Sequence, residues 1–258
     1  MITVKNLTKQ FAQKDGELLT AVDNVSFQVN KGEIVCLLGV NGAGKTTTMR
    51  VLSTVFEPTS GTAEIEGYDI VKQGDKVREN LGFLSGDTGL YTRLKVREFL
   101  RYFGDLYGLP RTATDSKIAE MAELLDMNSF LDKKIDFLST GMRQKVSIVR
   151  SIIHNPPVMI LDEPTAGLDI LTARNIVAFI KRSKEEGKSV LFSTHIMREA
   201  ERLADRIVLI HAGRILAEGT LEELRAKTDC FDLDDIFVYY VNNMVAEKVE
   251  EEVIENEF

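Results

Sequence analysis

The chain has 258 residues, of which 44% are hydrophobic and 28% are charged, and its formal net charge is −8. This length allows one large or two small domains with a hydrophobic core, and the negative charge argues against a broad nucleic-acid-binding surface, so no nucleic-acid partner is expected. The longest clean apolar run, residues 34–40, is far too short to cross a bilayer, and the N-terminus shows no signal peptide.

The first third of the chain is predicted to begin with strands. We expect strands over 2–8, 25–29 and 33–39, a helix from about Lys45, and a pair of strands around 62–70. A helical block is predicted from about 90 to 154, where one face of a helix carries apolar residues at the spacing of helical turns.

Strands return in the last third of the chain. They are predicted at 158–162, 189–194 and 206–210, with helices between them and a tight hairpin turn at 212–215. This alternation predicts βαβ units and a parallel sheet, with the helical block inserted in that sheet's sequence. After about residue 228 the composition becomes acidic, which indicates either a frayed tail or a short helix using the apolar positions 245, 249 and 253.

The segment GVNGAGKTT, residues 39–47, matches the phosphate-binding pattern G-x-x-x-x-G-K-[ST]. Its glycines allow backbone N–H groups to curl around phosphates, Lys45 can reach the β- and γ-phosphate oxygens, and the Thr46 hydroxyl can bind Mg²⁺. The alternative is a glycine turn without a ligand. The position between a buried strand and a helix favours the phosphate site.

The segment VMILDEP, residues 158–164, is an apolar strand that ends in two adjacent acids. That end faces the ligand crevice of an open α/β sheet, where Asp162 suits Mg²⁺ and Glu163 suits activation of a water molecule. His195 ends a third apolar strand on the same side and could bond a terminal phosphate, although a single histidine is more often structural. His154 and His211 are interpreted as structural, and the two cysteines, Cys36 and Cys230, provide no disulfide framework, as in a reduced cytoplasmic protein.

The segment FLSTGMRQKV, residues 137–146, predicts a helix that begins at an anion-binding end. Ser139 is a good N-cap, Gly141 leaves N–H groups uncovered, and the first turn carries Arg143 and Lys145 but no acid. A helix N-terminus is already positive, so added cations there indicate a seat for an anion.

The ordered set of the phosphate loop, LSTGM, LDEP, AGLD (166–169) and STH resembles the ATP-binding subunits of ABC transporters over about residues 1–225. Kinases and GTPases share the phosphate loop but do not resemble this combination. The resemblance implies an α/β fold of the P-loop NTPase, ABC type: a mixed-sheet core, an antiparallel β subdomain and an inserted helical subdomain at about 87–155. Residues 226–258 would form a C-terminal extension, partly helical or frayed.

The resemblance also implies the roles of individual residues. Glu163 would be the catalytic base and His195 would contact the γ-phosphate, so both are expected to be catalytic. Thr46 and Asp162 would hold Mg²⁺. Two copies would face head to tail, so that the helix start of one caps the ATP held by the other. The residues expected to bind ATP are Phe11, Gly39, Asn41, Gly42, Ala43, Gly44, Lys45, Thr46, Thr47, Ser139, Gly141 and Asp169.

Two departures from the family pattern stand out. The signature is usually LSGGQ, and here Thr140 and Met142 replace a Gly and the Gln. In the segment LGFLSGDTGLY, residues 81–91, the family normally has a glutamine near the end of the strand, and Gly86 falls there, beside Ser85 and Asp87.

Within the family, the sequence looks most like bacterial exporter ATPases of the sodium-extrusion (NatA-like) type, which implies sodium efflux through a separate membrane permease. Alternatives are a drug, lipid or polysaccharide exporter ATPase, a soluble ABC ATPase such as an iron–sulfur assembly factor, and an inactive ATP-binding module. The expected location is cytoplasmic, peripheral on the inner face of the cell membrane, with ATP and Mg²⁺ as cofactors and an ATP-dependent homodimer as the working form. Aromatic residues near 86–107 either receive a permease helix or fill the subdomain's own core: Tyr91, Phe99, Tyr102, Phe103 and Tyr107.

Overall fold

The computed structural model describes residues 1–14, 16–86 and 89–255 and contains two β-sheets. The central sheet has six strands in the order β10-β9-β3-β8-β7-β6, all neighbours parallel except the closing β9–β10 pair. The expected α/β fold with a mixed sheet is therefore confirmed. The bounds of these strands are β3 Ile34–Leu38, β6 Leu81–Leu84, β7 Val158–Asp162, β8 Ser189–Thr194, β9 Arg206–His211 and β10 Arg214–Gly219.

The second sheet is antiparallel, in the order β2-β1-β4-β5. Its two long strands extend well beyond the predicted ranges, because β1 and β2 continue to pair along a bulged hairpin as far as Ala12 and Leu18. The bounds are β1 Ile2–Ala12, β2 Leu18–Val29, β4 Ser60–Ile65 and β5 Tyr68–Asp69.

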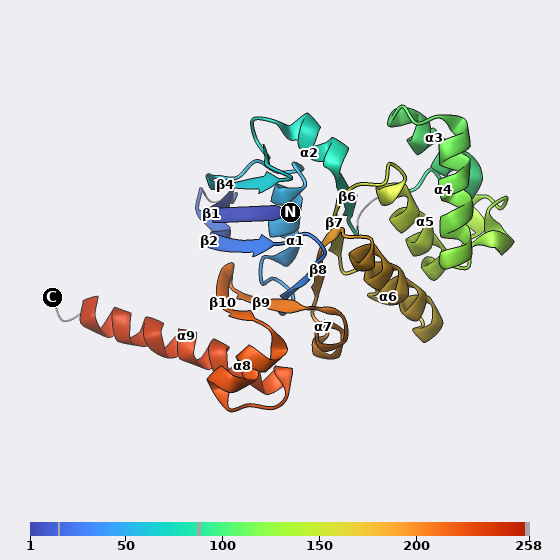
Figure 1. Cartoon of the computed structure of the whole chain (residues 1–258). Coiled ribbons are helices and arrows are strands. Elements are labelled where there is room, and N and C mark those ends of the chain that lie inside the picture. Colours follow the sequence, from blue (N-terminus) through green and yellow to red (C-terminus); the bar gives the residue numbers. More distant parts are fainter. Residues whose placement is uncertain (15, 87–88, 256–258) are drawn as a thin grey trace.

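The buried core forms two layers on opposite faces of the central sheet. Successive side chains of a strand point to opposite faces, so Val35 and Leu37 pack with helix α1 (Lys45–Leu52) and the antiparallel sheet. Cys36 and Leu38 face the other layer, which holds the remaining long helices. Helix α1 is thus enclosed between the two sheets (Figure 1), which fixes the loop that precedes it.

The helical block forms a group at one end of the molecule, away from the antiparallel sheet (Figure 1). It contains α3 (Val96–Leu106), α4 (Arg111–Leu124), two short 3₁₀ turns, η1 (Asn128–Phe130) and η2 (Ile135–Phe137), and α5 (Thr140–Ile152). A short helix that the sequence did not indicate, α2 (Gly74–Asn80), precedes β6.

The remaining helices are α6 (Ile170–Glu185), α7 (Met197–Leu203), α8 (Leu221–Thr228) and α9 (Leu233–Glu255). Helix α9 is longer than the short helix suggested by the sequence. Its first turns bury Leu233, Ile236 and Phe237 in the main core, while its far end projects from the body (Figure 1). In the part of the chain that the structure describes, no helix is long and apolar enough to cross a membrane.

Candidate active site

The phosphate-binding segment lies between β3 and α1, as predicted, and its shape depends on two glycines. Gly44 adopts φ +103°, and a Cβ placed there would lie 2.5 Å from the Ala21 carbonyl oxygen. At Gly39 a Cβ would lie 2.2 Å from the Ile210 carbonyl oxygen. Only glycine fits this close approach of backbone to backbone, so the curl of the loop is imposed by its surroundings.

Lys45 is the buried cation of the loop, with a side chain 5% exposed. Its Nζ donates to the carbonyl oxygens of Gly39 at 2.7 Å and Val40 at 3.1 Å, and it lies 3.7 Å from Glu163 Oε1. Burial lowers the pKa of the Lys45 ammonium, and the carboxylates of Glu163 and Asp162 act in the opposite direction. The cation is therefore held at the mouth of the loop, where phosphate oxygens would replace these acceptors.

The two acids stand where parallel strands β7 and β8 end side by side. Asp162 pairs in register with Ser193, whose hydroxyl donates to Asp162 Oδ1 at 2.6 Å. The same hydroxyl oxygen accepts the Glu163 N–H at 3.0 Å. Ser193, which the sequence analysis did not single out, thus orients both acids. Its only sequence signal is its place one residue from the end of an apolar strand.

Glu163 and His195 meet in front of the phosphate loop. His195 Nδ1 lies 3.1 Å from Glu163 Oε1, and the same oxygen faces Lys45. Glu163 has φ +47°, a left-handed conformation that is uncommon for a residue with a long side chain. Such local strain is typical of functional sites, where the surrounding contacts hold it. The Glu163 carboxylate therefore lies between the Lys45 ammonium and the His195 imidazole.

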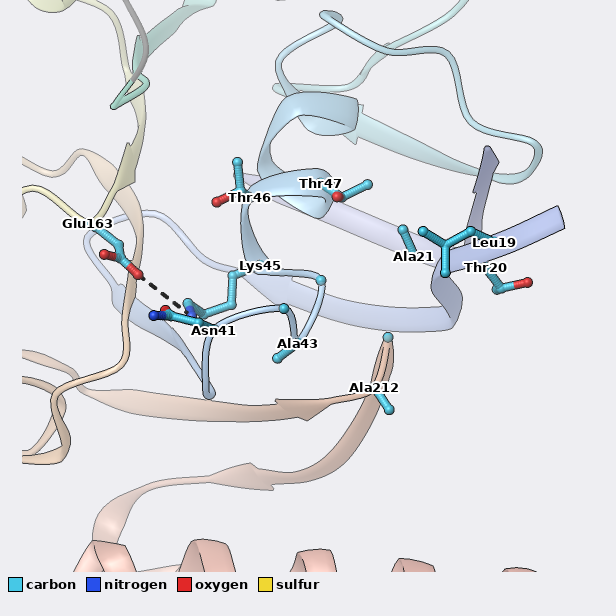
Figure 2. Close-up of a pocket in the computed structure, with 13 residues that line it drawn as sticks. Leu19, Thr20, Ala21, Asn41, Ala43, Lys45, Thr46, Thr47, Glu163 and Ala212 are labelled. Atoms are coloured by element: carbon cyan, nitrogen blue, oxygen red, sulfur yellow. Dashed lines mark ion pairs between the residues drawn. The ribbon is translucent and has the colours of Figure 1, made fainter. Parts of the chain in front are cut away.

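A cavity of about 490 Å³ opens over the phosphate loop. Figure 2 shows Lys45, Thr46 and Glu163 on one side of it and Leu19, Thr20 and Ala21 of strand β2 on the other. Ala212 and Gly213, in the turn between β9 and β10, complete the lining. The sequence indicated a tight turn at this position but not that it meets the loop, where Gly213 N–H donates to the Ala43 carbonyl at 3.0 Å.

The cavity contains most of the residues expected to bind ATP from one chain: Asn41, Gly42, Ala43, Gly44, Lys45, Thr46 and Thr47. Phe11, the expected adenine contact, is not among the lining residues. Its ring packs edge-on against Phe56 with centroids 5.4 Å apart, and Lys9 Nζ lies 5.0 Å from it. The prolonged β1–β2 hairpin brings Leu19 opposite Phe11 and places β2 residues over the loop instead.

The helix start at Ser139 lies at the surface, in the same chain but outside this cavity. Ser139 Oγ accepts the Met142 N–H at 3.3 Å, as expected of an N-cap. Arg143 is exposed and donates to the Asp136 carbonyl at 3.0 Å. Lys145 does not add to the positive charge at the helix start, because it is only 7% exposed and its Nζ lies at the Asp126 carbonyl within the helical subdomain.

Asp169 lies beside this helix start and caps helix α6. Its carboxylate accepts the N–H groups of Leu171 and Thr172, each at 3.0 Å, and the Thr172 hydroxyl at 2.7 Å. These hydrogen bonds hold the pKa of Asp169 below its usual range. A Cβ at Gly141 would lie 3.1 Å from the Thr172 hydroxyl, so glycine allows the α5 helix start to approach Asp169 closely.

The segment after β6 contains the position at which this chain has a glycine and the family normally has a glutamine. Gly86 is exposed, and a Cβ there would meet nothing within 4 Å. The neighbouring Asp87 lies outside the described residues, so the structure assigns no replacement for the glutamine there.

The oxygen atoms of Asp162 and Thr46 near the phosphate loop suit the coordination of a magnesium ion. Asp162 is buried, one of its oxygens is held by Ser193, and the other makes no hydrogen bond among the described residues. The Thr46 hydroxyl lines the cavity next to Lys45. Mg²⁺ prefers oxygen ligands and commonly takes one or two from the protein and the rest from phosphates and water. The described residues contain no cluster of three or more His, Cys, Asp or Glu that could hold a metal by itself.

Comparison with known proteins agrees with this geometry. The model of the ABC transporter family matches residues 22–166, which is more than half of the chain. The chain belongs to the ABC transporter family. It is an ATP-binding subunit of the ATPase type, as its resemblance in sequence implied.

Curated relatives of this ATP-binding subunit include transporter ATPases from several bacteria. The ABC transporter ATP-binding protein NatA of Bacillus subtilis is 41% identical over 92% of this chain and 97% of its own length. The probable multidrug ABC transporter ATP-binding protein YbhF of Escherichia coli is 39% identical over 88% of this chain and 38% of its own length.

Solved structures show the same fold. A chain described as the ATP-binding subunit of an ABC transporter superposes with a TM-score of 0.85 at 31% identity, covering 93% of this chain and 99% of that one. A dimeric post-hydrolysis state of the ATP-binding cassette MJ0796, bound to ADP and Pi, gives a TM-score of 0.74 at 26% identity, covering 85% and 98%.

Proposed function

We propose that this subunit hydrolyses ATP with Glu163 as the general base and His195 as the contact to the γ-phosphate. The observation that carries the proposal is the position of Glu163 Oε1, which lies 3.7 Å from Lys45 Nζ and 3.1 Å from His195 Nδ1 at the open side of the phosphate loop. A water molecule in line with the terminal phosphate could give its proton to this carboxylate.

The other residues position the substrate. The N–H groups of the loop and the Lys45 ammonium bind the β- and γ-phosphates, and the start of helix α1 carries no acid that would repel them. Thr46 and Asp162 would hold Mg²⁺, which when bound neutralises phosphate charge. Ser193 keeps Asp162 and the Glu163 backbone in place through its two hydrogen bonds.

The test of the base is Glu163→Gln, which preserves shape and removes basicity. We expect the hydrolysis rate to fall by about 100-fold or more while ATP still binds, and ATP-bound dimers to accumulate. Glu79→Gln, an exposed acid on helix α2, is the matched control and should leave turnover unchanged. Normal hydrolysis by Glu163→Gln would refute the assignment.

We further propose that the working form is a dimer in which each ATP lies between one phosphate loop and the partner's Ser139–Gly141 helix start. The surface position of Ser139, outside the cavity of its own chain, supports this. The dimeric cassette with bound ADP and Pi, which shares this fold, supports it as well. Dimerisation should depend on ATP, since the phosphates supply the anion that two positive surfaces need.

For transport, we propose that this subunit energises an exporter with a separate membrane permease, so that it sits at the cytoplasmic face of the membrane. Sodium is the first candidate cargo, because the sequence resembles sodium-extrusion ATPases of the NatA-like type and NatA of Bacillus subtilis aligns over nearly the whole of both chains. Drug export is the second candidate, because another relative carries the name of a multidrug transporter protein.

A cleft of about 200 Å³ between the helical subdomain and the core is proposed to receive the permease. The aromatic residues predicted for this role divide in two. Phe99 is buried in the subdomain, as the alternative held, while Phe103 and Tyr107 line the cleft together with Phe83 and Arg150. Tyr91 and Tyr102 remain exposed beside it. Aromatic walls around a cation suit a helix that carries apolar and acidic side chains.

Cargo can be tested in a strain lacking the gene for this subunit. Wild-type protein should restore tolerance to sodium, and the Glu163→Gln variant should not. If tolerance to sodium is unchanged and tolerance to drugs is restored, the second candidate replaces the first. Cysteine pairs between the cleft residues and the co-expressed permease should crosslink, and their failure to do so in an assembled complex would refute the docking site.

A further inference from the structure

Glu199, on the first turn of helix α7, has no role in the site described above. Its carboxylate receives two hydroxyl groups. Thr194 Oγ1 donates to Oε2 at 2.6 Å, and Thr165 Oγ1 donates to Oε1 through a short hydrogen bond. Thr194 and Thr165 are only 2% and 9% exposed, so these contacts are largely shielded from solvent.

The two threonines belong to the two segments that carry the catalytic pair. Thr165 is two residues beyond Glu163, and Thr194 immediately precedes His195. Thr194, the last residue of β8, turns toward Glu199, while the next residue, His195, turns toward Glu163. Glu199 therefore binds both segments on the side away from the crevice, and the Glu163–His195 contact lies on the crevice side.

The carboxylate is well suited to this task. No ion pair involving Glu199 exists among the described residues, so the two hydroxyls are its hydrogen-bonding partners there. A carboxylate only accepts, and both hydroxyls donate to it, which fixes their rotors in one direction. Thr194 Oγ1 in turn accepts the Ile196 N–H at 3.1 Å, which extends the network to the residue after His195.

Ser193 also joins the ends of β7 and β8, on the side that faces the crevice. Its hydroxyl joins Asp162 and the Glu163 N–H. The left-handed backbone of Glu163, at φ +47°, needs such support on both sides, because a strained conformation persists only where its surroundings impose it. Glu199 supplies support that Ser193 does not, since in the described residues the Ser193 hydroxyl forms hydrogen bonds with Asp162 and the Glu163 N–H but not with Thr165.

We propose that Glu199 is a positioning residue that sets the Glu163–His195 geometry by holding Thr165 and Thr194 together. The proposal rests on Glu163 acting as the base. It predicts that Glu199 affects the rate of hydrolysis far more than the binding of ATP, because the N–H groups of the phosphate loop and the Lys45 ammonium, which bind most of the phosphate oxygens, lie on a different segment.

The main variants are Glu199→Ala, which removes both hydrogen bonds, and Thr165→Val and Thr194→Val, which each remove one hydrogen bond to Glu199 and keep the side-chain shape. Thr194→Val also removes the acceptor of the Ile196 N–H, so Thr165→Val is the cleaner of the two. For Glu199→Ala we expect kcat to fall between about 10- and 100-fold, the loss that a small misplacement of reacting groups causes. Each threonine variant should lower kcat to a smaller extent. The dissociation constant for ATP, measured by titration, should stay within twofold of wild type.

Two controls separate positioning from general damage. Ser183→Ala removes a buried hydroxyl hydrogen bond at the far end of helix α6 and should leave kcat unchanged. Arg198→Ala changes the exposed neighbour of Glu199 and should also leave it unchanged. If Glu199→Ala is poorly folded, the two isosteric threonine variants carry the test by themselves.

A double variant decides whether Glu199 acts through the base. In a Glu163→Gln background, measured by single-turnover phosphate release, adding Glu199→Ala should cause no further loss, since there is no base left to position. The inference would be overturned if Glu199→Ala lowered the rate equally in the wild-type and Glu163→Gln backgrounds. It would also be overturned if Glu199→Ala, Thr165→Val and Thr194→Val all had a normal kcat. Full activity of Glu163→Gln by itself would instead overturn the assignment of the base.

Discussion

Replacing Gly44 by alanine should damage the phosphate loop in two ways, through backbone strain and through a backbone contact. The residue has φ +103°, a conformation that costs an alanine roughly 1–3 kcal/mol. The new Cβ would also lie 2.5 Å from the Ala21 carbonyl oxygen, so strand β2 and the loop must separate by about 0.9 Å to reach an ordinary contact of 3.4 Å. That movement displaces Lys45, the next residue, from its phosphate-binding position.

The two costs together should exceed about 3 kcal/mol of unfolding free energy. At about 2–4 °C per kcal/mol for a chain of this size, the melting temperature should fall by at least about 6 °C. Gly67→Ala is the control for strain alone, because Gly67 has φ +81° but open space around its Cβ position. Gly86→Ala is the control in which neither backbone strain nor a close contact is expected, since Gly86 has an ordinary φ and open surroundings.

The assays are thermal unfolding and ATP titration for all three variants. Gly67→Ala should lose about 1–2 kcal/mol of stability and bind ATP normally, and Gly86→Ala should match or slightly exceed wild type in stability. Gly44→Ala should lose both stability and ATP affinity. Equal destabilisation of Gly44→Ala and Gly67→Ala, or normal ATP binding by Gly44→Ala, would refute the reasoning from backbone contact.

Lys45→Ala should weaken ATP binding strongly, because it removes the buried cation of the loop, and an unchanged affinity in a titration would contradict its role. Mixed dimers test the shared site. Ser139→Arg in one chain and Lys45→Ala in the other places both lesions at one site and leaves the second intact, so about half the activity should remain if the sites fire independently. Both lesions in one chain damage both sites and should abolish activity, and equal activity of the two arrangements would argue against sharing. Burial lowers the pKa of His154 to about 4, so protonating this histidine opposes folding, and the stability it supports falls as pH drops from about 6.5 toward 4. His154→Phe should flatten that part of the unfolding profile, and the same pH dependence in the variant would exclude His154 as its source.

The sequence by itself determined the identity of the phosphate loop, the strand end that carries Asp162 and Glu163, and the family. The reason is local. A glycine-rich turn between a buried strand and a helix, and acids directly after an apolar strand, each create their chemistry within a few residues. The parallel sheet then follows from the alternation of strands and helices, since such strands must be joined by crossovers.

What faces the loop from elsewhere in the chain was decided only by the tertiary structure. Ala21 and Gly213 belong to two hairpins whose register depends on bulges and on long-range pairing, so no local pattern shows that they meet residues 42–45. The contact between Phe11, the predicted adenine contact, and Phe56 was likewise visible only in the tertiary structure.

The direction of a side chain at a helix start also depends on what packs around it. Lys145 was expected in the first turn of α5 but lies in its second turn, and its ammonium lies at the Asp126 carbonyl because the end of helix α4 approaches there. Glu199 looks like an ordinary surface acid of a helical segment. Only the pairing of β7 with β8 brings Thr165 and Thr194 within reach of one carboxylate, because parallel strands deliver their ends to the same edge of the sheet.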